Sequence, residues 1–150
     1  MSLQVSNGFK EQFALFFKSK FDGSVIRVFS GTQPDHSDLA ETGTLLGTIT
    51  LNGVADAGLI FSASGPFIVK DAFASWILTT VATGTATWFR CVADSEDAGG
   101  ISYSALRFDG SVSEDELSNA EMILDDTALL TGRQYQVDAL VYTLPPIISP

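Results

Sequence analysis

Large apolar side chains near the N-terminus recur at the spacing of one face of an α-helix, which predicts a helix at about 7–21. Ser6 or Asn7 can cap its start, because their short side chains accept hydrogen bonds from free backbone N–H groups. Asp22-Gly23 then ends the helix, with the glycine available for a left-handed C-cap. The predicted helix carries one apolar stripe, formed by Phe9, Phe13, Phe16, Phe17 and Phe21.

From residue 24 onward the apolar positions alternate with period two, which is typical of β-strands. The segments 24–30 and 44–51 are rich in β-branched and aromatic residues, and the Asn52-Gly53 pair that follows is a tight-turn signal. Two segments around Gly84 indicate a hairpin, and Asp109-Gly110 indicates the end of a strand. The remaining strands are expected at 59–62, 67–71, 75–83, 85–93, 102–108, 120–124 and 134–143.

About eight or nine short strands with regular turn signals are typical of an antiparallel sandwich, jelly roll or barrel. Long helices do not alternate with these strands, which disfavours a parallel α/β sheet. We therefore expect a mainly β protein, an antiparallel β-sandwich or jelly roll with one N-terminal amphipathic helix. Residues 1–150 are expected to form a single β domain that ends in a Pro-rich tail at 144–150.

The charge of the chain is strongly acidic, with a net charge of −10. Residues 1–20 contain three lysines and one glutamate and carry +2, so the remaining 130 residues carry −12. An acidic surface repels phosphate backbones, which argues against nucleic acid as a main partner. No apolar run approaches the roughly 18 residues that a membrane span needs, and no signal peptide is evident at the start, so no membrane partner is expected.

The chain contains one cysteine, Cys91, and one histidine, His36. A nucleophile and its base need only meet in space, so a Cys91–His36 pair is conceivable. Cys91 lies in the middle of a predicted strand, however, where a cysteine normally packs as a small buried apolar side chain. The sequence has no Gly-x-Ser-x-Gly nucleophile motif and no phosphate-binding glycine loop, and no catalytic residue is predicted.

Acidic clusters lie in predicted loops or at strand ends and are expected to be solvated. The segment 94–97 has oxygen ligands that calcium favours, but it lacks the spacing of an EF-hand loop. Two loop carboxylates are also the machinery of a glycan hydrolase, although no pair is marked by its position. We therefore expect no metal ion and no cofactor. The clusters are Asp94/Glu96/Asp97, Glu114/Asp115/Glu116 and Asp125/Asp126.

Two apolar features are candidate protein interfaces. The phenylalanine stripe either covers the sheet of its own chain or docks against a partner, since buried aromatic side chains often anchor interfaces. The tail either lies free or reaches a neighbouring subunit with its two isoleucines. The candidate interface residues are Phe9, Phe13, Phe16, Phe17, Ile147 and Ile148.

Five segments up to about residue 112 also carry a family resemblance: VSNGF at 5–9, VIRVFSGTQP at 25–34, AETGTLLGTITL at 40–51, ATGTATWFR at 82–90 and FDGSV at 108–112. Together they resemble small virion structural proteins of tailed bacteriophages, decoration- or cement-like and often of unassigned function. These motifs are turns and strand starts, so they imply a shared fold rather than a shared site. The resemblance brings no catalytic residues.

The resemblance implies a non-enzymatic capsid decoration or cement protein, made in the bacterial host cytoplasm and located in the virion. Its expected partners are the major capsid protein or another virion protein, and it is expected to be a homo-oligomer, a dimer or trimer. A tail or baseplate component has the same parts. A host-glycan-binding module is another alternative, for which exposed aromatic residues such as Trp76 or Tyr103 should line a groove. A glycan hydrolase is a further, weaker alternative.

Overall fold

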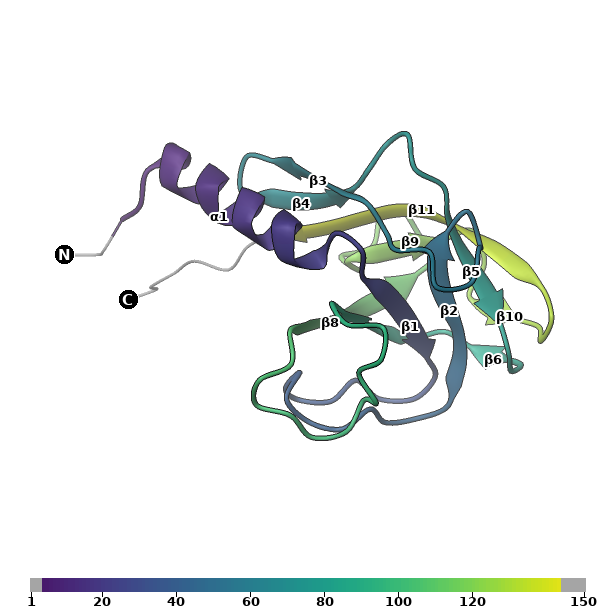
Figure 1. The fold of residues 1–150 in the computed structure, drawn as a ribbon. Coiled ribbons are helices and arrows are strands. Elements are labelled where there is room, and N and C mark those ends of the chain that lie inside the picture. Colours follow the sequence, from purple (N-terminus) through teal and green to yellow (C-terminus); the bar gives the residue numbers. More distant parts are fainter. Residues whose placement is uncertain (1–3, 144–150) are drawn as a thin grey trace.

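The computed structural model describes residues 4–143 and contains one helix followed by a largely antiparallel array of strands (Figure 1). The mainly β class with an N-terminal helix is confirmed. The tail at 144–150, with Ile147 and Ile148, lies outside the described residues. The elements are α1 (Asn7–Phe21), β1 (Val25–Phe29), β2 (Leu45–Leu51), β3 (Phe61–Ser64), β4 (Phe67–Lys70), β5 (Trp76–Thr80), β6 (Gly84–Thr85), β7 (Trp88–Val92), β8 (Arg107–Ser113), β9 (Met122–Leu124), β10 (Ala128–Leu129) and β11 (Gln134–Thr143).

The strands close into a barrel-like sheet in the order β11-β5-β2-β1-β7-β8-β9, with β9 returning to β11. All neighbours are antiparallel except β8 and β9. Closure depends on β11, which pairs with β5 through 134–136 and with β9 through 137–140, and then with β4 through 141–143. The closed sheet is not clearly the sandwich or jelly roll that we expected from the sequence.

Three local predictions are wrong. The strand expected at 102–108 is instead β8 at Arg107–Ser113, and 102–106 lies in a loop. The expected hairpin around Gly84 does not form, because β5 pairs with β2 and β11 while β7 pairs with β1 and β8. The expected turn at Asp109-Gly110 lies inside β8. A Cβ at Gly110 would lie 2.6 Å from Cε1 of Phe89, so the glycine serves close packing against that ring rather than a chain reversal.

The core lies inside the barrel and continues under α1. Inward residues of neighbouring strands alternate with outward ones, as on β8, where Phe108, Gly110 and Val112 are buried. Phe108 is the centre of an aromatic cluster, because its ring lies within 5.0 to 6.4 Å of five other rings. Those rings belong to Phe17, Phe21, Phe61, Phe89 and Tyr142, and they join the helix to the barrel.

Candidate functional site

The phenylalanine stripe of α1 is divided between two directions. Ala14 and Phe21 are buried and Phe17 packs against the core, so this side of the helix faces the body. Phe9, Phe13 and Phe16 turn away from the body and are 49%, 42% and 60% exposed. We call these three residues the aromatic helix face. The stripe is therefore partly core and partly free surface.

Local sequence features hold α1 in place. The Ser6 side chain accepts a hydrogen bond from the Phe9 N–H at 3.1 Å, which caps the first turn. Near the end of the helix, Lys18 Nζ lies 2.5 Å from the Asp22 carboxylate, and Asp22 also accepts from the Phe61 N–H of β3 at 3.0 Å. The body-facing side chains lie in the later turns, and the first turns extend past the β3–β4 hairpin (Figure 1).

The aromatic helix face is ordered within itself and carries positive charge nearby. The rings of Phe9 and Phe13 meet edge to face at 4.9 Å. Lys20 Nζ lies 5.3 Å from the centre of the Phe16 ring, a cation–π contact. This patch therefore combines apolar rings with the positive charge of Lys20, on a chain that is acidic elsewhere, and suits an apolar partner surface with an acidic rim.

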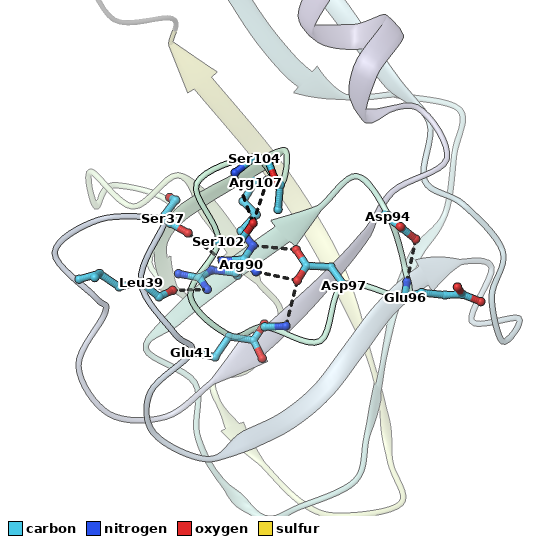
Figure 2. A network of polar contacts seen from close by, with 12 residues as sticks. Ser37, Leu39, Glu41, Arg90, Asp94, Glu96, Asp97, Ser102, Ser104 and Arg107 are labelled. Atoms are coloured by element: carbon cyan, nitrogen blue, oxygen red, sulfur yellow. Dashed lines mark hydrogen bonds and ion pairs between the residues drawn. The ribbon is translucent and has the colours of Figure 1, made fainter.

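The outer face of β1, β7 and β8 points away from the core and bears arginines. These arginines hold two long loops, 30–44 and 93–106 (Figure 2). Arg90 on β7 is fully buried and donates to both carboxylate oxygens of Asp109, at 2.8 and 2.9 Å. Its remaining nitrogen, Nη1, donates to the carbonyl of Leu39 at 2.8 Å. Arg90 thus ties the first loop to the sheet through a buried pair.

Two further arginines hold the same loops. Arg107 on β8 donates to both oxygens of Asp97, at 2.7 and 2.6 Å, and to the carbonyl of Ser37 at 3.1 Å. Arg27 on β1 pairs with Glu41 at 2.8 Å and also donates to the Asp97 carbonyl. The hydrogen bonds from Arg107 hold the pKa of the Asp97 carboxyl at about 2. These ion pairs have a structural role, because each of them fastens a loop.

The Asp97–Arg107 pair predicts acid sensitivity. The folded pKa of Asp97 lies below its ordinary value of 3.8, so the unfolded chain takes up a proton first as the pH falls. The stability from this pair is therefore full above about pH 5 and is lost between about pH 5 and pH 2. In urea denaturation series over this range, Asp97→Asn should be less stable than the unsubstituted chain at pH 6, and the difference should shrink toward pH 2. A difference that stays constant with pH contradicts the assignment.

The conceivable catalytic pair is not assembled. Cys91 points into the barrel, where burial raises the pKa of its thiol and its Sγ lies 3.3 Å from Ser24 Oγ. His36 lies in the loop on the outer face of the sheet, exposed beside Asp38. The neighbouring Arg90 points outward and reaches Leu39 of the same loop, so the β7 backbone separates the cysteine from the histidine.

The acidic clusters serve turns and ion pairs. Asp94 accepts from the Glu96 N–H at 2.9 Å, and Asp97 is held by Arg107. Glu114 accepts from the N–H and hydroxyl of Thr127 at 3.0 Å, and Asp126 accepts from the Ala128 N–H at 2.9 Å. Within residues 4–143, no group of three or more His, Cys, Asp or Glu side chains is placed to hold a metal ion.

The two aromatic residues expected to line a glycan groove do not share a surface, because one is buried and the other is exposed. Trp76 is fully buried at the start of β5, with its ring 4.9 Å from that of Phe61, so the expectation that it is exposed is wrong. Tyr103 is 84% exposed in the loop 93–106. Trp76 is on the inward face of β5 with Leu78 and Thr80, and the sequence pattern could not show which face of this strand meets the core.

The buried Arg90–Asp109 pair was missed by sequence reasoning. Its signal was an arginine within the apolar run Trp88-Phe89-Arg90-Cys91-Val92, since a charge in such a strand needs a partner.

Among residues 4–143 no helix has the length and apolarity of a membrane span. Comparison of the chain with family models, curated proteins and solved structures finds no match.

Proposed function

We propose that this chain is a non-enzymatic structural protein of a tailed-phage virion, a capsid decoration or cement protein that stabilises the head through protein–protein contacts. The observation that carries the proposal is the aromatic helix face, where three neighbouring phenylalanines lie in solvent on a helix that is anchored by its other side. Exposed apolar patches of this kind mark interaction surfaces. Aromatic side chains are also the residues that most often anchor interfaces.

The remaining ionisable groups support a structural role. Buried charged side chains are paired, Arg90 with Asp109 and Arg107 with Asp97, and Cys91 is enclosed by the barrel. The contacts of Phe17 and Phe21 with Phe108 hold the helix against the barrel in one orientation, which lowers the entropic cost of docking. On a capsid lattice, many copies of one modest contact add up to strong binding. A protein that binds only the assembled shell stabilises that shell by mass action.

The contact partner is proposed to be the major capsid protein or another virion protein, with the chain itself a dimer or trimer. Quantitative mass spectrometry of purified virions tests the location. Hundreds of copies per particle, in proportion to the major capsid protein, support a capsid cement. A handful of copies moves the chain to the tail or baseplate, and absence from particles removes the structural proposal.

Charge placed on the aromatic helix face should break the contact without unfolding the chain. We expect Phe13→Asp/Phe16→Asp to convert the oligomer to a folded monomer and to abolish binding to virions. Its free energy of unfolding should change by about 1 kcal/mol or less, because Phe13 and Phe16 are 42% and 60% exposed and lie outside the core. Light scattering after size exclusion, circular dichroism and virion co-sedimentation measure these outcomes.

Leu15→Asp is the matched control, since Leu15 is 50% exposed on another side of the same helix. This control should leave the oligomer and virion binding unchanged. If the double variant unfolds, the face belongs to the core. If it stays oligomeric and still binds virions, the aromatic helix face is not the interface.

A further inference from the structure

A cleft opens between the beginning of β8 and the end of β11. The short strand β9 separates these two strands only where it pairs with Val112–Ser113 and with Val137–Leu140. Beyond β9, toward Arg107 and Thr143, the described part of the chain places no strand between them. A cavity of about 390 Å³ lies there, lined by Arg107, Phe108 and Asp109 of β8 and by Tyr142 of β11. A second cavity of about 450 Å³, lined by 119–121 and 141–143, adjoins it at the end of β11. We call this opening the β8–β11 cleft.

The β8 side of the cleft is an open strand edge. Ala93 donates to the carbonyl of Leu106, and Val112 donates to the carbonyl of Thr87, so the even-numbered residues of β8 bond to β7. The main-chain N–H and C=O groups of Arg107, Asp109 and Ser111 therefore point toward the cleft. Residues 4–143 supply hydrogen-bond partners on this edge for Ser111 but not for Arg107 or Asp109.

Glu121 already occupies part of this edge as a hydrogen-bond acceptor. Its carboxylate receives hydrogen bonds from the Ser111 N–H and hydroxyl, both at 3.3 Å, in the place where the carbonyl of a neighbouring strand would lie. On the other wall, Val141 donates to the carbonyl of Glu121 at 2.9 Å, so the alternate residues of β11 also face the cleft. One side chain thus substitutes for a strand at the inner end of the cleft.

The walls define which strand fits. The rings of Phe108 and Tyr142 lie 5.1 Å apart and form the floor, so inward side chains of an added strand must be small. The loop 33–38 forms the outer wall and brings Asp35 and Asp38 to it. Arg107 is engaged by Asp97 and Ser37, which leaves the outer wall acidic. Outward side chains of an added strand therefore face carboxylates.

We infer that the β8–β11 cleft binds an extended segment of a partner protein, which adds a strand along β8 and alternates small residues with lysine or arginine. Main-chain hydrogen bonds to Arg107 and Asp109 supply the affinity, and the acidic wall and aromatic floor supply the specificity, as in other strand-addition complexes. This contact goes beyond the aromatic helix face, lies on different elements and does not depend on the proposed function.

The probe is a fluorescent peptide in which lysine and serine alternate, added to the full chain labelled with nitrogen-15. We expect saturable binding, with amide shifts concentrated at Arg107, Asp109, Val141 and Thr143 and slower hydrogen exchange at the first two. A glutamate–serine peptide should not bind, because its charge is reversed. A lysine–serine peptide that is N-methylated at every residue should also fail, because it lacks the main-chain donors in either strand direction.

Two variants with equal charge change locate the site. Asp35→Lys/Asp38→Lys should weaken binding about tenfold or more, whereas Asp125→Lys/Asp138→Lys, on exposed acids outside the cleft lining, should have a much smaller effect. Equal weakening in both variants, shifts confined to α1, or no binding at millimolar peptide overturns the inference. Shifts of the same amides by oligosaccharides but not by the peptide also overturn it, in favour of a glycan site.

Discussion

Arg90→Ala is expected to lower the free energy of unfolding by about 3–5 kcal/mol. The guanidinium of Arg90 is fully buried and bonds to both oxygens of Asp109, whose side chain is itself only 3% exposed. Removing the arginine leaves a buried carboxylate without its counter-charge and leaves the Leu39 carbonyl without its donor. Urea denaturation at neutral pH measures the loss.

Two comparisons separate the broken pair from a general effect of removing an arginine. Arg133→Ala removes an exposed arginine and should change stability by about 0.5 kcal/mol or less. Arg90→Met/Asp109→Leu replaces both charges with apolar side chains and should recover much of the loss, since such replacements are often neutral. A loss below about 1 kcal/mol in Arg90→Ala contradicts a buried, energetically coupled pair.

Phe108→Ala is also expected to lower the free energy of unfolding by about 3–5 kcal/mol, because it removes a ring from the centre of the core. Phe108 is 5% exposed and contacts the rings of Phe17 and Phe21 on the helix as well as those on the barrel. The substitution should therefore loosen α1 more than the distant strands. Denaturation measures the total cost, and hydrogen exchange of the α1 amides measures the loosening.

Phe73→Ala is the matched control, since Phe73 is 100% exposed and its removal should cost almost nothing. If hydrogen exchange in α1 is unchanged in Phe108→Ala, the helix is held by other contacts. That outcome would also mean that the barrel core does not fix the orientation of the aromatic helix face. The helix would then be less preorganised for docking than proposed.

Local patterns in the chain were enough for several elements. The helix follows from residues a few positions apart, because a capping serine, an apolar stripe and Asp22-Gly23 act on the backbone that contains them. The mainly β class follows in the same way from period-two alternation. Burial of Cys91 was also predictable, since a lone cysteine within an apolar strand usually faces the core.

The division of the phenylalanine stripe was not accessible from the sequence. Helical spacing places the five rings on one broad arc, but which part of that arc meets the barrel depends on how α1 lies against β3 and β4. Phe17 and Phe21 contact Phe108, which is 91 and 87 residues away from them in the chain. Contacts of that range leave no periodic signal.

Pairing between distant strands likewise decided closure of the sheet, the burial of Trp76 and the Arg90–Asp109 bond. Each depends on the register in which strands align, and that register is set by the whole packed sheet rather than by any one segment. The β8–β11 cleft is the clearest case, because it exists where β9 ends and no local motif marks it. The sequence by its local patterns therefore determines the helix and the strand-rich class, while the arrangement in space determines which aromatic side chains and which strand edges remain open to a partner.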